Sequence, residues 1–164
     1  MGNNLPQTTP FITFKLGSKT FAIRMTNVVK LLEPKSFNLT KEGNLAIRGL
    51  RSVNDYILPV LNIRKMLGMS SSYSNLDFGV LVIKSIENKN CSEFGILINS
   101  MGDISEFINE EIVPFSLETE KRKNKLISGL IKTDNEYVFI LDLNNISKQI
   151  KKGNVVEEIN KDLD

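Results

Sequence analysis

Two stretches of this chain repeat the same pattern of glycines and apolar residues. The matched positions are Gly49 and Gly129 (129 − 49 = 80), Leu61 and Leu141 (141 − 61 = 80), and, more loosely, Phe21 and Phe94 (94 − 21 = 73). A pattern that recurs at fixed spacing indicates two similar units in tandem. Two small units lying side by side offer surfaces and a seam rather than a catalytic cleft, so the repeat directs attention toward binding.

The repeated segments have the periodicity of short β-strands. From Phe11 to Leu16 the side chains alternate between two faces, and Thr20 to Ile23 follows after a turn at Gly17 and Ser18. Alternation of this kind around a tight turn predicts a hairpin. Many short strands separated by Gly and Asn turns, in two copies, predict a mainly β fold made of two small barrels.

The composition of the chain suggests where the units begin and end. A serine-rich stretch from Ser70 to Asn75 is the most linker-like segment. We therefore expect a flexible N-terminal arm at 1–9, a first barrel at 10–75, a second barrel at 76–150 and a flexible charged tail at 151–164. A unit of about 70 residues has a modest core of its own, so the two barrels are expected to pack together.

Short helices are expected at three places. Thr26 is a suitable cap for a helix or turn carrying Val28 and Val29, and Asn62 for a helix ending at Gly68. A terminal helix is expected at 144–150. The segment 116–124 is expected to be a mobile loop.

The composition argues against an enzyme. Histidine is absent, which removes the commonest general base and metal ligand. The single cysteine, Cys91, has no activating neighbour, and the aspartates lack the spacing of a calcium loop. We expect no catalytic residues, no cofactor and no metal. Without a signal sequence or a long apolar run, the chain is expected to be cytoplasmic, with no direct membrane insertion.

A nucleic-acid-binding module is the alternative from another class, because small β-barrels also serve that role. The net charge of +2 is small for neutralising phosphates, and the chain has no tryptophan. The basic cluster from Lys121 to Lys125 is flanked by Glu118 and Glu120, which favours a solvated loop. We therefore expect no nucleic-acid partner.

Two positions have a functional interpretation beside a purely structural one. Arg51 follows Gly49 and Leu50 at a strand end, either as an ordinary exposed arginine or as a guanidinium fork that reaches a partner. Val28 and Val29 cannot both face one narrow stripe of a helix, so one of them either packs in the core or lines a surface groove.

The order and spacing of several motifs resemble one known family. Gly49 to Ser52 is similar to that family's Asn-Leu-Arg-Gly motif, and Leu58 to Arg64 to its Ile-Pro-Val and Asp-Leu-Arg motifs. Supporting matches are the hairpin 11–23, the segment 94–98 and the strand 137–143. The family is that of the CheW-like coupling proteins of bacterial chemotaxis, and the similarity runs over about 10–150.

The resemblance implies a fold, a function and partners. The fold would be two packed SH3-like five-stranded β-barrels with short helices. The protein would be a non-catalytic adaptor that joins the cytoplasmic tip of transmembrane chemoreceptors to the regulatory domain of the histidine kinase CheA, recruited from the cytoplasm to receptor arrays. One barrel would present an apolar edge to the kinase, and the groove between the barrels would accept the receptor tip. A specialised CheW-like scaffold of another two-component pathway is the nearer alternative.

The resemblance also implies candidate receptor-binding residues. Arg51 matches the arginine of the Leu-Arg motif, Val28 an apolar groove position, and Val80 and Ile98 are expected near the seam between the barrels. Lys30 stands where an acidic residue can occur. Three further departures are Gly49 and Ser52 at the ends of the motif, about three extra residues before Pro59, and Asn62 where Asp is common.

Overall fold

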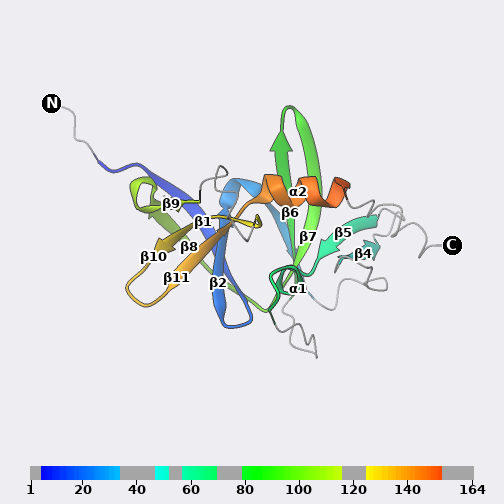
Figure 1. Ribbon diagram of the computed structural model, residues 1–164, viewed down its shortest axis with the longest axis horizontal. Coiled ribbons are helices and arrows are strands. Elements are labelled where there is room, and N and C mark those ends of the chain that lie inside the picture. The colour runs from blue at the N-terminus through cyan, green and yellow to red at the C-terminus, as the bar shows by residue number, and fades with distance from the viewer. Residues whose placement is uncertain (1–4, 34–46, 52–56, 70–78, 116–124, 153–164) are drawn as a thin grey trace.

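The chain folds into two strongly curved β-sheets that pack against each other, each forming an SH3-like barrel (Figure 1). This is seen in a computed structural model, which describes residues 5–33, 47–51, 57–69, 79–115 and 125–152, with the backbone alone at 47–51, 57, 151 and 152. The linker expected at 70–75, the loop expected at 116–124, residues 1–4 of the expected N-terminal arm and residues 153–164 of the expected C-terminal tail lie outside the described residues. The mainly β fold class predicted from the sequence is confirmed.

Sheet A has six strands and sheet B has five, and we call the corresponding barrels A and B. The order in sheet A is β8 (Ser100–Ile108), β1 (Thr8–Leu16), β2 (Lys19–Arg24), β11 (Tyr137–Leu141), β10 (Ile127–Lys132) and the short β9 (Val113–Pro114). The order in sheet B is β3 (Val28–Leu32), β6 (Gly79–Glu87), β7 (Asn90–Ile98), β5 (Ile57–Leu61) and β4 (Ile47–Arg51). The helical elements are α1 (Ile63–Met66), α2 (Leu143–Lys152) and the 3-10 turns η1 (Met25–Asn27) and η3 (Asn109–Glu111).

The strands of the two sheets cut across the boundary expected between residues 75 and 76. Sheet B is built from the contiguous stretch 28–98, whereas sheet A combines the hairpin β1–β2 with strands that begin after residue 99. The reason is parallel pairing between distant strands, β2 with β11 and β5 with β7. The hairpin β1–β2 from the first repeat therefore completes sheet A, whose other strands come from the second repeat. The hairpin β6–β7 from the second repeat completes sheet B, whose other strands come from the first.

The internal repeat is nevertheless exact in its strand register. In barrel A, Ile140 pairs with Ala22, and in barrel B, Val60 pairs with Gly95. The first members are 80 positions apart (140 − 60) and the second members 73 (95 − 22), the same two offsets that the sequence shows. The tandem repeat inferred from the sequence is thus a repeat of three-dimensional structure.

Three apolar clusters hold the sheets together. The largest lies between the two sheets and draws on both, so we call it the joint core; its buried members include Ile12, Phe14, Phe21, Leu81, Ile83, Phe94, Ile96, Ile98, Leu141 and Ile146. Barrel B has its own interior of Leu58, Val60, Val80, Val82 and Leu97, and barrel A has Phe11, Ala22, Ile131, Val138 and Ile140. Consecutive residues of β6 therefore alternate between two cores, which explains why the strand is apolar throughout.

Several local predictions are confirmed by backbone geometry. Gly17 adopts φ +62° in the first hairpin turn, as a residue without Cβ does readily. The side chain of Asn62 accepts a hydrogen bond from the amide of Lys65 at 2.9 Å and caps α1, which is followed by Gly68 at φ +72°. The α2 helix covers the terminal helix expected at 144–150.

The helix or turn expected to carry Val28 and Val29 is a strand in the structure. The chain makes only the 3-10 turn η1 around Thr26 and then enters β3 at Val28. The adjacent β-branched residues Val28 and Val29 suit a strand better than a helix, and the edge of β6 offers backbone partners.

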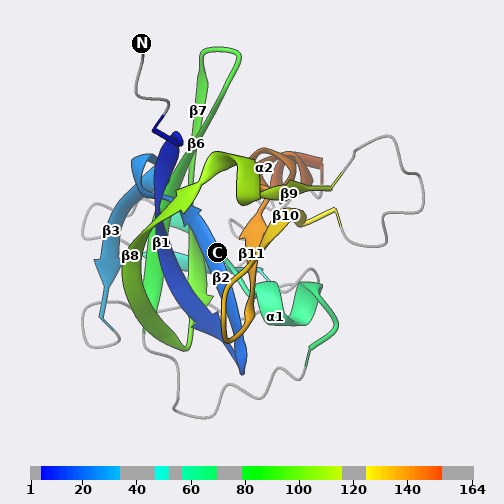
Figure 2. The same ribbon diagram turned by 90° about the vertical axis from the view of Figure 1, so that its left-hand side faces the viewer.

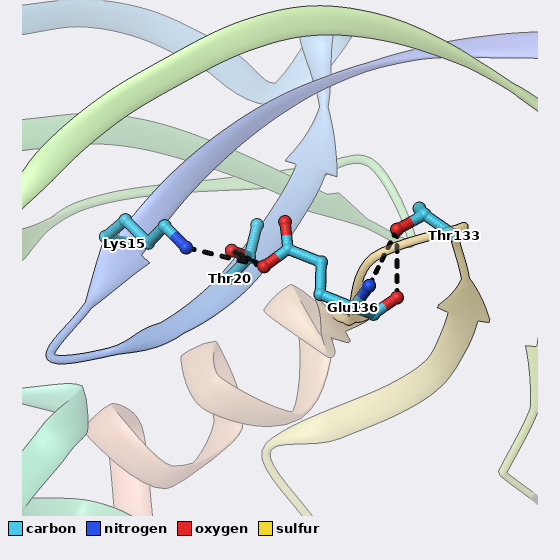
Figure 3. A network of polar contacts seen from close by, with 4 residues as sticks. All are labelled: Lys15, Thr20, Thr133 and Glu136. Atoms are coloured by element: carbon cyan, nitrogen blue, oxygen red, sulfur yellow. Dashed lines mark hydrogen bonds and ion pairs between the residues drawn. The ribbon is translucent and has the colours of Figure 1, made fainter.

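A polar network ties the two ends of the chain together in barrel A (Figure 3). Glu136 accepts a hydrogen bond from the Thr20 hydroxyl at 2.8 Å and an ion-pair contact from Lys15 at 3.4 Å, both through Oε2. Its backbone amide donates to the Thr133 hydroxyl at 3.2 Å. The turn between β10 and β11 is therefore fastened to the hairpin β1–β2, more than a hundred residues earlier. The Thr20 hydrogen bond chiefly lowers the pKa of Glu136 below its usual 4.5.

Gly95→Ala should destabilise the fold. A Cβ at this position would lie 2.6 Å from Val80 Cγ1 and 3.2 Å from Val60 Cγ2. Overpacking of a closed core costs about 1–3 kcal/mol of unfolding free energy, measurable by urea denaturation. Its counterpart in barrel A, Ala22, already carries this methyl group, so the reciprocal Ala22→Gly is the matched control and should cost about 1 kcal/mol or less. An unchanged midpoint for Gly95→Ala would contradict the packing described.

Glu136→Gln should lower stability only where the carboxylate is charged. Because folding lowers the pKa of Glu136, its contribution is present above the pKa of the unfolded chain and is lost as the pH falls through the folded pKa. The group is partly exposed, so we expect a difference below about 1 kcal/mol at pH 7. Urea denaturation across the acid range should show the wild type and the variant converging below about pH 4.5. Asp134→Asn, in the same turn, controls for the loss of one negative charge.

Candidate functional site

The joint core reaches the surface between the edge strands β3 and β8. Val28 pairs with Ile83 in sheet B, and residues paired directly across two strands share a face of the sheet. Since Ile83 belongs to the joint core, Val28 lies on that face and packs against the core while staying partly exposed. Leu31 does the same opposite Leu81.

Sheet A presents a matching pair from β8. Met101 pairs with Phe14 and Ile104 with Ile12, and both partners belong to the joint core. Met101 packs against this core, whereas Ile104 is 61% exposed. We call Val28, Leu31, Met101 and Ile104 together the seam mouth. Figure 2 shows β3 and β8 on the same side of the molecule.

The seam mouth has the symmetry of the repeat. Val28 corresponds to Met101 and Leu31 to Ile104, each by the offset of 73 (101 − 28 and 104 − 31). The register also shifts at the same point in both strands, between the two members of each pair, as in a β-bulge. Bulges often re-aim side chains near functional sites. Each barrel therefore contributes two apolar side chains to the seam mouth.

An exposed apolar surface on two edge strands is suited to binding a protein segment. Val29, beside the seam mouth, is 42% exposed and adds to the apolar area on β3. Contiguous apolar side chains that face solvent mark interaction sites more often than chance. The geometry offers contact and burial, and it does not offer reactive groups.

Lys30 and Asp103 lie on the faces of their strands opposite to the seam mouth, whereas Glu106 lies two residues from Ile104 on the same face of β8. Lys30 pairs with Val82, which belongs to the interior of barrel B, so it projects from the face of β3 opposite to Val28. It is exposed at the sheet edge. The equivalent position in β8 is Asp103 (103 − 30 = 73), also exposed. The two edges therefore carry opposite charges at matching positions.

Two of the candidate residues from the sequence are buried. Val80 is 0% exposed inside barrel B, and Ile98 is 0% exposed within the joint core. A partner cannot touch either side chain in this conformation. Ile98 does lie in the seam between the sheets, whereas Val80 faces away from it. Both residues act on the surface only by supporting the strands above them.

Arg51 is placed by its backbone alone. It is the last residue of β4, paired with Ile57, and three strands separate β4 from β3 in the order of sheet B. Its side chain lies outside the described residues. Strand order thus brings Val28 and Lys30 together on β3 and places Arg51 on the other outer strand.

The described part of the chain contains no cluster of three or more Cys, Asp or Glu side chains that could hold a metal ion. Cys91 is exposed near the tip of the β6–β7 hairpin, opposite Ile86. Within the same residues, no helix has both the length and the apolar character needed to cross a membrane.

Sequence reasoning missed three members of the seam mouth, Leu31, Met101 and Ile104. The signal was available in the offset of 73 that links Phe21 to Phe94, because the same offset carries Val28 to Met101 and Leu31 to Ile104. It was obscured because β3 was expected to be helical, and a helix would not align with a strand.

Comparison with known proteins finds a matching family and two relatives. The family model for the CheW-like domain matches residues 10–151. Two curated relatives carry the name chemotaxis protein CheW: one from Helicobacter pylori is 24% identical over 139 residues, covering 85% of this chain and 81% of the relative. The other, from Thermotoga maritima, is 22% identical over 141 residues, covering 85% and 87%.

A solved structure shares the fold. The scaffolding protein TtCheW from Thermoanaerobacter tengcongensis superposes with a TM-score of 0.64 at 15% identity, over 83% of this chain and 90% of that one.

Substitutions should separate the supporting residues from the surface residues. Ile98→Ala removes a fully buried side chain and should lower the unfolding free energy by about 2–5 kcal/mol. Val80→Ala should act in the same direction by less, since fewer methyl groups are lost. Ile104→Ala, at an exposed position, should stay within about 0.5 kcal/mol of the wild type. Urea denaturation checks all three, and a large loss for Ile104→Ala would mean that the seam mouth is interior rather than surface.

Proposed function

The chain belongs to the CheW-like domain family, and from this premise we propose that it is a non-catalytic chemotaxis adaptor that couples transmembrane chemoreceptors to the histidine kinase CheA. Relatives of similar length are named as chemotaxis proteins, and the solved structure that shares its fold is described as a scaffolding protein. The absence of histidine from the sequence leaves the chain without a phosphoacceptor of that kind. Any signal would therefore pass through contacts.

The observation that carries the proposal is the seam mouth. The cytoplasmic tip of a chemoreceptor is helical, and an amphipathic helix binds by laying its apolar face in an apolar groove. Val28 and Leu31 from one barrel and Met101 and Ile104 from the other supply apolar anchors on both sides of the seam. Most of the binding energy at protein interfaces comes from a few residues near the centre of the contact.

The remaining candidates have different roles in this proposal. Arg51 supplies orientation through its guanidinium fork, which suits a partner's carboxylate or carbonyl. Lys30 contributes charge at the edge of the surface, where an exposed group affects association more than affinity. Val80 and Ile98 support β6 and β7 from within.

The kinase is proposed to dock elsewhere, with an outer barrel edge meeting the similar barrel of its regulatory domain. Two separate surfaces allow both partners to be held at once. Simultaneous engagement raises the effective concentration of kinase and receptor without any new contact. This would recruit the adaptor from the cytoplasm to membrane-bound receptor arrays.

Ile104→Glu should abolish capture of a receptor signalling fragment while leaving capture of the CheA regulatory domain intact. The change places a charge among the apolar anchors, where a helix would have to desolvate it. Arg51→Ala and Arg51→Glu should reduce receptor capture, with the fold intact by circular dichroism. Tyr137→Glu is the matched control, because Tyr137 is 53% exposed and lies on β11, three strands from β8 in sheet A.

The pull-down separates the parts of the proposal. Failure of the wild type to bind either partner would contradict the adaptor function. Receptor capture that survives Ile104→Glu would remove the seam mouth from the interface, and capture that survives Arg51→Glu would remove Arg51.

A further inference from the structure

A groove of about 530 Å³ opens beside the first turn of α2, in barrel A. Its lining includes Arg24, Asn27, Ile86, Asp142, Leu143 and Asn144. None of the four seam-mouth residues lines this groove, and Figure 2 shows α2 across the molecule from β3. Nothing in the adaptor function proposed above uses it.

The repeat provides an internal comparison for this groove. The offset of 80 carries Arg64, in α1, to Asn144, in α2 (144 − 64). The offset between β1 and β6 is 69, because Phe14 and Ile83 hold equivalent places opposite Phe21 and Phe94 (83 − 14). It carries Gly17 to position 86 (86 − 17).

In barrel B the equivalent space is filled by Arg64. Its Nη1 donates a hydrogen bond to Asn99 Oδ1 at 3.3 Å. Its Nε would lie 3.8 Å from a Cβ built on Gly17. The guanidinium group therefore lies between the β1–β2 turn and the β7–β8 junction.

In barrel A a shorter side chain stands at that place. Asn144 Oδ1 accepts a hydrogen bond from the Ser85 hydroxyl of β6 at 2.7 Å, so this side chain is held against β6. The counterparts of Gly17 and of the β7–β8 junction are Ile86 and the η1 region with Asn27, and both line the groove. The part of the groove next to α2 thus corresponds to the space that Arg64 fills in the other barrel, and the rest of the groove is lined by Phe11, Ile112, Pro114, Ser128, Ile140 and Leu141.

The groove also gains a negative charge. Asp142 corresponds to Asn62 (142 − 62 = 80), and both cap their helix, accepting from the amides of Asn145 at 3.0 Å and Lys65 at 2.9 Å. A carboxylate thus replaces a neutral amide. The exposed Arg24 and the positive end of the α2 dipole both repel a cation in this groove. Binding of a cation must therefore depend on the negative charge of Asp142.

We propose that this groove binds an arginine side chain of a protein partner, in the position that Arg64 occupies in barrel B. Asp142 is the anionic acceptor, and Asn27 and Asn144 supply neutral polar groups around the guanidinium plane. Ile86 and Leu143 cover the methylene stem. Arginine suits this site better than lysine, because its planar fork matches several acceptors and its stem tolerates apolar surroundings.

The first test uses the full-length protein and N-acetyl-arginine amide, followed by NMR. We expect saturable shifts at Asn144, Leu143 and Ile86, with the isosteric but neutral N-acetyl-citrulline amide at least about tenfold weaker. An absence of saturable shifts up to the solubility limit of the probe would overturn the proposal. So would equal binding of the two probes.

Three variants test the assigned roles. Asn144→Arg should fill the groove as Arg64 does and abolish probe binding. Asp142→Asn keeps the capping oxygen, as Asn62 shows, and should weaken binding about tenfold. Arg24→Ala should leave binding equal or stronger.

Each variant has an outcome that contradicts the proposal. Undiminished binding in Asn144→Arg or Asp142→Asn would remove the groove as the site. Loss of binding in Arg24→Ala would contradict the proposal, in which Arg24 opposes the bound cation. If Asn144→Arg fails to fold by circular dichroism, Asp142→Asn alone decides the question.

Discussion

The structure depends on two parallel strand pairings between segments far apart in the sequence. The β2 strand pairs with β11, and β5 pairs with β7. Without the first, the strands β8, β1 and β2 are separated from β11, β10 and β9; without the second, β4 and β5 are detached from barrel B. Parallel neighbours need a long connection. Between β2 and β11 the chain forms all of sheet B, and between β5 and β7 it forms α1 and β6. The joint core is the consequence, since the hairpins bring one apolar face of each sheet together.

Local chemistry explains which parts of this fold could be predicted. The turn at Gly17 and the cap at Asn62 depend on residues within a few positions, so they were visible in the sequence. Partner choice is a different kind of information. The alternation in β6 was visible as an apolar run, but only the three-dimensional pairing shows that Val80 faces barrel B while Leu81 faces the joint core. For the same reason, the sequence does not reveal that strands from both sides of residue 75 join in each sheet.

The candidate site shows the same division. Val28 was found through a family pattern, whereas Ile104 becomes visible only when β8 is aligned with β3 by the repeat. Arg51 was also found through the family pattern, yet strand order places it on the outer strand away from β3. The two copies also differ where they meet solvent: the equivalent of Lys30 is Asp103, and the equivalent of Arg64 is Asn144. Duplication conserved the interior and left the two surfaces free to specialise.

The contiguous origin of sheet B affects how the protein is made. All of its strands lie within residues 28–98, so barrel B is complete once that stretch has left the ribosome. Barrel A must wait for β11, which ends at Leu141, while its first hairpin has been exposed since residue 24. Domains emerge and fold in order during synthesis, and unpaired strand edges are then open to misassociation. In the nascent chain, the edges of the β1–β2 hairpin that β8 and β11 later cover therefore stay unpaired until those strands have been synthesised.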